Sequence, residues 1–186
     1  MVISKELNDS IEITVEKLRN KEVVIIPTDT VYGFSGIVPW TEDYIRQIKG
    51  REENKSFIQL IAHPKDIYYY TDEKIDKKFL SMWPGPLTII VPQKEDKTKT
   101  IALRCPNDAW LRKIIELTGF SIYSTSVNHS GKKILSDIYD IVKEFDKDVS
   151  LIVDDGDKRE AKASTIISII DGEVKIVRQG DLEIQL

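Results

Sequence analysis

The sequence predicts a single α/β domain, residues 1–186, in which helices flank an open, twisted, mixed β-sheet. Short β-branched runs alternate with amphipathic segments along the chain, which is the pattern of an α/β fold. The 186 residues, 41% of them hydrophobic, can build one well-buried core but are few for two domains. Near the C-terminus two apolar runs flank Asp171-Gly172, which is typical of an antiparallel hairpin, so an all-parallel sheet is disfavoured.

The first half of the chain is predicted to begin with a helix and then enter the sheet. Apolar residues recur at helical spacing over residues 4–19, and Asn20 is placed to end this helix in the left-handed conformation. Residues 23–26 are a β-branched run, which predicts a buried strand ending at Pro27. The other segments predicted here are a helix at 42–48, a strand at 57–62 that His63-Pro64 ends, and helical or mixed segments at 65–70 and 73–83.

The second half is predicted to supply most of the strands. Residues 93–99 carry charges and no apolar side chain, so we expect a loop there, between strands at 87–92 and 100–104. A helix at 109–118 is predicted to end at Gly119. The other predicted segments are a strand at 120–125, a helix at 135–145, and strands at 150–153, 164–170 and 174–177.

The composition excludes several classes of protein. With 27 basic and 31 acidic residues the net charge is −4, so an anion site has to be a local cluster and not a basic surface. Cys105 is the only cysteine, which excludes an internal disulfide and a zinc site built from several thiolates. The N-terminal segment has no signal-peptide core and no apolar run is long enough to span a membrane, so we expect a cytoplasmic protein without membrane contact.

Two short polar motifs, Lys49-Gly50-Arg51 and Ser126-Val127-Asn128, predict a site for an anionic ligand. On an extended segment the two cations would project to the same side, and the serine and asparagine would add neutral hydrogen-bonding groups. The P-loop and dinucleotide-binding glycine patterns do not occur, so side chains would have to hold a phosphate chain. Each motif alone is typical of a surface or a turn. The signal is their order together with the segments at 27–33 and 83–88.

Other reactive residues receive structural interpretations. His63 and His129 have no partner at the spacing of a zinc site or a nucleophilic triad. Cys105 follows Arg104 and could be an activated thiolate, but a buried apolar filler at a strand end is favoured. The acidic run at 154–157 lacks the remaining ligands of a calcium loop, so a solvated acidic turn is expected.

From about residue 16 to residue 180, the chain resembles the YrdC/TsaC family of L-threonylcarbamoyladenylate synthases. The stretches that carry the resemblance are 27–33, 49–51, 83–88, 102–106, 124–131, 164–167 and 178–180. The resemblance implies one YrdC-like domain of the short form, without the additional C-terminal domain of the long form.

The resemblance also implies a nucleotidyltransferase reaction. L-threonine, bicarbonate or carbon dioxide, and ATP would give L-threonylcarbamoyl-AMP and pyrophosphate. Magnesium would be carried by the ATP phosphates, without a metal site in the protein. A separate tRNA threonylcarbamoyl transferase would use the product to form N6-threonylcarbamoyladenosine (t6A) at position 37 of tRNA, and weak tRNA binding is a further expectation.

Site residues follow from the same resemblance. The signature of active synthases, taken as catalytic, falls on Lys49, Arg51, Ser126 and Asn128. The ATP-contacting positions fall on Arg51, Lys55, Thr100, Ser126 and Arg178. The threonine-contacting positions fall on Thr30, Arg104, Ser124 and Ser164. These roles suit the side chains, because arginine grips phosphate or carboxylate oxygens in a planar fork and lysine acts as a point charge.

The chain departs from the family pattern around the nucleotide loops. The family usually has proline at the positions of Glu52, Ser56 and Ala163. It has serine or an equivalent at the position of Ile134, for which Ser136 is the nearest substitute, and aspartate at that of Ser168.

Other interpretations compete with the enzyme. A non-catalytic RNA-binding module of the same fold would need a basic face and would lack the signature. A carbamoyl-transfer domain of a larger maturation enzyme would sit in a long chain with cysteine pairs. A plain α/β domain whose polar turns only cap strands would explain each motif singly but not their order.

Overall fold

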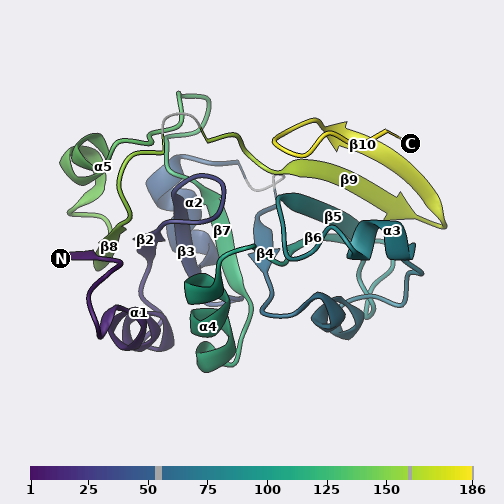
Figure 1. Cartoon of the computed structure of the whole chain (residues 1–186), viewed down its shortest axis with the longest axis horizontal. Coiled ribbons are helices and arrows are strands. Elements are labelled where there is room, and N and C mark those ends of the chain that lie inside the picture. Colours follow the sequence, from purple (N-terminus) through teal and green to yellow (C-terminus); the bar gives the residue numbers. More distant parts are fainter. Residues whose placement is uncertain (53–55, 159–160, 186) are drawn as a thin grey trace.

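A single ten-stranded sheet organises the computed structural model, which describes residues 1–52, 56–158 and 161–185. Its strand order is β1-β8-β2-β3-β7-β4-β6-β5-β9-β10, so the two ends of the chain supply opposite edges (Figure 1). The strands are β1 (Val2–Ser4), β2 (Val24–Ile26), β3 (Gly33–Ile37), β4 (Ile58–Leu60), β5 (Leu87–Pro92), β6 (Thr100–Arg104), β7 (Ile122–Ser126), β8 (Leu151–Asp154), β9 (Thr165–Ile170) and β10 (Glu173–Arg178).

The sheet is mixed, as predicted. The parallel pairs are β1 with β8, β2 with β8, β4 with β6, and β5 with β9. The remaining neighbours are antiparallel, and they include the hairpins β5–β6 and β9–β10. The α/β class with an open mixed sheet is therefore confirmed.

Helices cover both faces of the N-terminal half of the sheet, strands β1, β8, β2, β3 and β7. The described helices are α1 (Ser10–Arg19), α2 (Glu42–Lys49), the 3-10 helix η1 (Pro64–Tyr69), α3 (Lys77–Leu80), α4 (Ala109–Thr118) and α5 (Ile138–Phe145). Of these, α1, α2, α4 and α5 cover the N-terminal half, whereas η1 and α3 pack against the other half. Strand β2 shows why both faces are apolar, because Val24 and Ile26 pack toward α1 and α4 while Ile25 packs toward α2 and α5. A strand buried on both faces reads as a continuous apolar run and not as an alternation.

The C-terminal half of the sheet, strands β6, β5, β9 and β10, has a hydrophobic core on one of its two faces. Leu87, Ile89 and Val91 of β5 are fully buried there against Phe79 of α3. Thr88 and Ile90 alternate with them and point to the opposite face. That opposite face holds the pocket described below.

The structure corrects several predicted elements. Helix α1 begins at Ser10 and not at residue 4, because Val2–Ser4 pairs with β8 as an edge strand. Asn20 is not left-handed, with a φ of −74°, and Lys21 takes that conformation at 61°. Strand β3 is absent from the prediction, and only α3 is α-helical within 73–83.

Other local predictions are confirmed. Gly119 ends α4 at a φ of 78°. Asp171 and Gly172 have φ values of 51° and 78°, so both residues of the β9–β10 turn have the positive φ of the favoured hairpin turn. None of the described helices is long and apolar enough to cross a membrane.

Candidate active site

A pocket of about 410 Å³ opens on the sheet face that bears Thr88 and Ile90. Its floor includes a row of side chains across four neighbouring strands, because Ser124 pairs with Ile58, Ile58 with Ala102, and Ala102 with Ile90. Strand β6 lines the pocket with Thr100, Ala102 and Arg104, which share one face by the two-residue period of a strand. Sheet register therefore positions the site.

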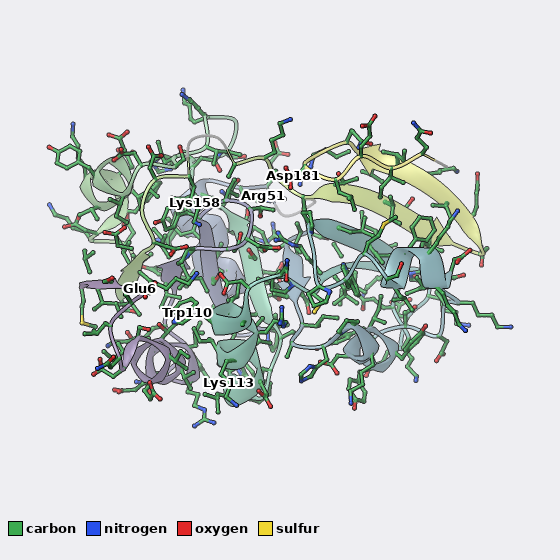
Figure 2. The ribbon with its side chains drawn as sticks, viewed as in Figure 1. Glu6, Arg51, Trp110, Lys113, Lys158 and Asp181 are labelled. Atoms are coloured by element: carbon green, nitrogen blue, oxygen red, sulfur yellow. The ribbon has the colours of Figure 1, made fainter. Side chains whose placement is uncertain are left out.

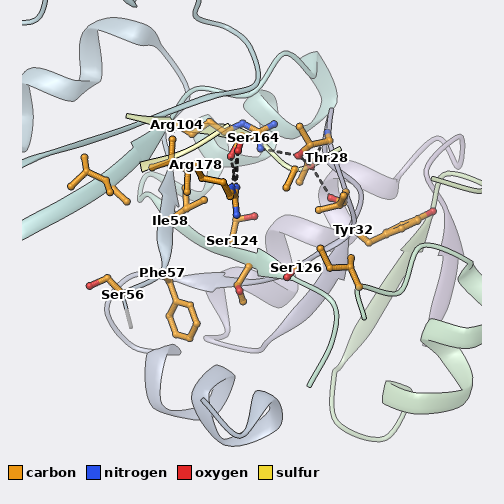
Figure 3. A pocket seen from close by; sticks show the side chains of 18 of the residues that line it. Thr28, Tyr32, Ser56, Phe57, Ile58, Arg104, Ser124, Ser126, Ser164 and Arg178 are labelled. Atoms are coloured by element: carbon orange, nitrogen blue, oxygen red, sulfur yellow. Dashed lines mark hydrogen bonds between the residues drawn. The ribbon is translucent and has the colours of Figure 1, made fainter. Parts of the chain in front are cut away.

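Arg104 forms the buried end of this pocket (Figure 3). Its guanidinium forms an ion pair with Asp29, donates from Nη1 to Thr30 Oγ1 at 2.9 Å, and donates from Nε to the Gly85 carbonyl at 3.3 Å. Burial lowers the pKa of Arg104, and the neighbouring Asp29 carboxylate opposes that shift. Asp29 also accepts from the backbone N–H of Asn107 at 2.8 Å, so one carboxylate fixes both Arg104 and the loop after β6.

The segment at 27–33 orients the Thr30 hydroxyl. Thr28 Oγ1 donates to the Val31 carbonyl at 2.7 Å and lies 2.9 Å from Thr30 Oγ1. Since the single hydroxyl hydrogen of Thr28 is used on Val31, Thr30 donates to Thr28. Thr30 accepts in turn from Arg104, so its remaining lone pair can accept from a ligand hydroxyl.

Arg178 reaches the pocket because β10 contains a bulge. Ile176 pairs with Ile167 and Arg178 with Ile166, so two residues of β10 advance against one of β9. Arg178 Nε and Nη2 donate to the Ser164 carbonyl at 3.1 and 2.7 Å, as Figure 3 shows. Ser164 Oγ lies 2.9 Å from Thr88 Oγ1. Burial lowers the pKa of Arg178.

Arg51 lies on the other side of the pocket, near the middle of the molecule (Figure 2). Its guanidinium is 4.9 Å from the ring centre of Phe57 and donates to the Ser56 carbonyl at 2.9 Å. The Arg46 guanidinium is 4.8 Å from the same ring. Burial, and then the charge of Arg46, lower the pKa of Arg51. The aromatic ring therefore holds together two cations that would otherwise repel.

The prediction that Lys49 and Arg51 lie on one extended segment and project to the same side is wrong. Lys49 is the last residue of α2, and Gly50 turns the chain in the left-handed conformation at a φ of 58°. Lys49 is only 2% exposed, and its ammonium donates to the Ser126 carbonyl at 2.5 Å and to the Asn128 carbonyl at 2.8 Å. Lys49 and Asn128 are not among the described residues that line the pocket. Lys55 lies outside the described residues.

The remaining predicted site residues meet in one pocket. These are Thr30, Arg51, Thr100, Arg104, Ser124, Ser126, Ser164 and Arg178. The described lining contains three arginines and no acidic residue, so it suits an anionic ligand. The described residues also hold no group of three or more His, Cys, Asp or Glu side chains suited to a metal ion.

Several lining residues are not among the predicted site residues. They are Thr28, Val31, Tyr32, Ser56, Phe57, Ile58, Ile90, Ala102, Thr125, Ile134, Ala163 and Ile166. Many of them are neighbours of predicted residues on the same strand or turn, so strand periodicity could have found Ala102. Ile58 and Ile90 become lining residues only through pairing between strands, which a single sequence does not show.

The structural interpretations hold for Cys105 and the two histidines but only in part for the acidic turn. Cys105 is buried, and burial raises the pKa of its thiol to about 12, so it is an apolar filler and not a thiolate. His63 caps η1, and His129 lies 3.1 Å from Glu144 on the surface. In the acidic turn, Asp155 is not simply solvated, because it pairs with Lys5 at 3.2 Å and with Lys158 at 2.9 Å.

Comparison with known proteins decides the family. A family model, Sua5_yciO_yrdC, described as telomere recombination, matches residues 16–180. The chain belongs to this family. It is 34% identical to a putative threonylcarbamoyl-AMP synthase of Methanocaldococcus jannaschii, over 97% of this chain and 92% of that protein. It is 31% identical to the threonylcarbamoyl-AMP synthase of Bacillus subtilis, over 89% of this chain but only 51% of that protein.

Solved structures of the family share the fold. Pyrococcus abyssi Sua5 complexed with L-threonine matches with a TM-score of 0.86 and 26% identity, over 97% of this chain and 57% of that chain. The chain thus spans nearly all of the Methanocaldococcus relative but about half of the Bacillus and Pyrococcus proteins. The sequence-based assignment to the family is confirmed.

Proposed function

We propose that this chain is a nucleotidyltransferase that forms L-threonylcarbamoyl-AMP from L-threonine, bicarbonate or carbon dioxide, and ATP, and releases pyrophosphate. The observation that carries the proposal is a pocket with a buried guanidinium beside small hydroxyls at one end and further arginines along its wall. Such a pocket suits a small amino acid next to a polyphosphate. The names of the relatives support an enzyme over a non-catalytic RNA-binding module.

The reaction requires positioning and charge stabilisation more than covalent catalysis. The uncharged amine of threonine adds to carbon dioxide to give a carbamate and loses a proton. A carbamate oxygen then forms a bond to the α-phosphorus of ATP, and the bond from that phosphorus to the bridging oxygen breaks. Pyrophosphate leaves with the electron pair. Arginines aimed at the phosphate oxygens lower the barrier by neutralising charge that develops on them.

The two ends of the pocket divide the substrates in this proposal. Arg104 binds the threonine carboxylate, while Thr30, Ser124 and Ser164 surround its side chain and amine. Arg51 and Arg178 face the phosphates, and Thr100 and Ser126 complete the ATP site. Lys55 belongs to the same predicted ATP site. Magnesium would enter on the ATP phosphates and offset their charge, because the described lining offers no carboxylate to hold it.

The product is a mixed anhydride of a carbamic acid and AMP, so its consumer must be a transferase that moves the threonylcarbamoyl group to an amine. We infer that this consumer is a tRNA threonylcarbamoyl transferase that forms t6A at position 37. Weak binding of tRNA by this chain belongs to the same proposal.

Product analysis tests the proposal. The purified chain is incubated with ATP, magnesium, bicarbonate and labelled L-threonine, and threonylcarbamoyl-AMP and pyrophosphate are measured. Arg51→Met should reduce turnover about tenfold to a thousandfold, since lost contacts to a transferring phosphoryl group cost about 2 to 4 kcal/mol. Arg19→Met is the matched control, because Arg19 lies on α1 and contacts the Leu117 carbonyl. Absence of both products with the wild-type chain would reject the enzyme.

A further inference from the structure

Lys49 holds the turn that follows β7 through both its side chain and its backbone. Its ammonium donates to the Ser126 carbonyl, the Asn128 carbonyl and, at 3.0 Å, the Asn128 side-chain oxygen. Its own carbonyl accepts from the backbone N–H of Ser130 at 2.7 Å. The end of α2 and the turn at 126–130 therefore form one unit behind the pocket wall.

The orientation of the Asn128 amide is determined by its neighbours. Its Nδ2 donates to the His129 carbonyl at 3.0 Å and to the Lys132 carbonyl at 2.8 Å. Both partners are acceptors only, so the amino group must face them and Oδ1 must face the other way. Oδ1 meets the Lys49 ammonium there, together with Ser126 Oγ at 2.8 Å.

This orientation fixes the direction of the Ser126 hydroxyl. A carbonyl oxygen cannot donate, so Ser126 gives its single hydroxyl hydrogen to Asn128. Ser126 lines the pocket, so it presents lone pairs to a ligand there. Lone pairs repel phosphate oxygens and attract N–H or O–H groups.

We propose that Ser126 is a specificity-determining hydrogen-bond acceptor for a donor of the nucleoside, a ribose hydroxyl or the adenine amino group, and that Lys49 and Asn128 are positioning residues that impose this polarity. This inference rests on the proposed function, since it concerns the ATP side of the same pocket. Lys49 therefore acts on the nucleotide through Asn128 and Ser126 and not as a point charge on phosphate.

The test measures the affinity and kcat/KM of the wild-type chain for ATP and three analogues, 2′-deoxy-ATP, 3′-deoxy-ATP and the triphosphate of purine riboside, each of which lacks one donor. The wild-type chain should disfavour one analogue about 3–10-fold more than the other two, as loss of one hydrogen bond predicts. Ser126→Ala should weaken ATP binding by a similar factor and abolish discrimination against that analogue. Tripolyphosphate with magnesium, which has no nucleoside, should bind Ser126→Ala and the wild type equally.

Asn128→Ala and Lys49→Met separate positioning from simple damage. Asn128→Ala removes the acceptor of the Ser126 hydrogen, so Ser126 is free to rotate and the analogue discrimination should be lost although Ser126 is present. Lys49→Met removes the cation that holds the Asn128 oxygen and the turn, so it should weaken the discrimination. Ser130→Ala, in the same turn, is the matched control and should keep it. If Ser126→Ala weakens tripolyphosphate binding as much as ATP binding, or if discrimination survives in Asn128→Ala, the inference is wrong. A wild-type chain that neither binds nor turns over ATP would instead overturn the proposed function and this inference with it.

Discussion

At the scale of single residues, the proposed function makes buried Arg104 the group that binds the amino-acid substrate. Asp29 and Thr30 already hold its guanidinium in place, so a substrate carboxylate meets an oriented fork. We expect Arg104→Lys to raise the threonine KM tenfold or more and to change the ATP KM less than about threefold, because an ammonium cannot reproduce the planar fork. Separate titrations of the two substrates measure this. A larger defect for ATP would move Arg104 to the nucleotide side.

Thr30 predicts which amino acids the site accepts. Because Thr30 gives its hydrogen to Thr28, it can accept from the hydroxyl that threonine and serine share. Threonine should be preferred to serine by roughly 10 to 200-fold, the usual value of one methyl group, and valine should be rejected more strongly because it leaves polar groups unpaired. Pyrophosphate release with each amino acid at equal concentration decides the order. Equal use of valine and threonine is incompatible with this pocket.

Lys49 predicts a pH dependence of stability. Burial, and then the charge of Arg51, lower the pKa of Lys49 to about 7. The pKa of a lysine in the unfolded chain is about 10.4. Between these pH values the unfolded chain binds more protons, so the contribution of Lys49 to the free energy of unfolding rises with pH and is smallest below about pH 7. Urea unfolding of wild type and Lys49→Met at pH 6.5, 8 and 9.5 measures the difference. A difference that stays constant or falls with pH would contradict this assignment.

At the scale of elements, the sequence predicts best where one segment determines its own structure. Leu87–Pro92, Thr100–Arg104 and Ala109–Thr118 match their predicted bounds, since their apolar periodicity and terminal residues are local. Val2–Ser4 and Gly33–Ile37 were outside the prediction for physical reasons. The first is a short, mostly exposed edge strand, and the second contains two glycines and becomes a strand through its partners β2 and β7.

Site residues likewise divide into those that a local motif reveals and those that depend on contacts between distant segments. The segments that contain Thr30, Arg104 and Ser124 could be found from the sequence because the family resemblance rests on contiguous motifs there. The bulge that turns Arg178 toward Ser164, and the burial of Lys49 behind the pocket, depend on pairing and packing between distant segments. A single sequence does not encode these relations in any local pattern.

Gly180 connects the β9–β10 unit to the pocket. A Cβ at this position would lie 2.2 Å from the Ala163 carbonyl oxygen and 2.5 Å from that of Ser164, which are backbone atoms that cannot yield cheaply. We expect Gly180→Ala to lower the free energy of unfolding by about 1–3 kcal/mol and to weaken threonine binding, because Ser164 must shift. Gly131→Ala is a useful comparison, since open space surrounds Gly131 and only its φ of 77° is unfavourable. If Gly180→Ala is destabilised but binds threonine with unchanged affinity, Gly180 does not influence the site.

At the scale of the whole molecule, the pocket joins two halves of the sheet. Strand β7 and the turn before β3 contribute from the N-terminal half, and strands β6, β9 and β10 from the C-terminal half, with β4 between them. The three arginines gathered there repel one another without a ligand, and Arg178 lowers the pKa of Arg104 in addition to the effect of burial. An anionic ligand should therefore stabilise the fold as well as fill the pocket.

We expect each substrate to raise the free energy of unfolding, by about 2.7 kcal/mol at a concentration one hundred times its dissociation constant. Arg51→Met should remove most of the gain from ATP at the same fixed concentration and keep that from threonine, whereas Arg104→Lys should do the reverse, because the proposed function assigns the two cations to different substrates. Urea unfolding with each ligand measures the gains, and Arg19→Met should retain both. If either pocket variant loses both gains equally while its unliganded stability matches the wild type, the two substrates do not occupy separate ends, and the division of this pocket must be redrawn.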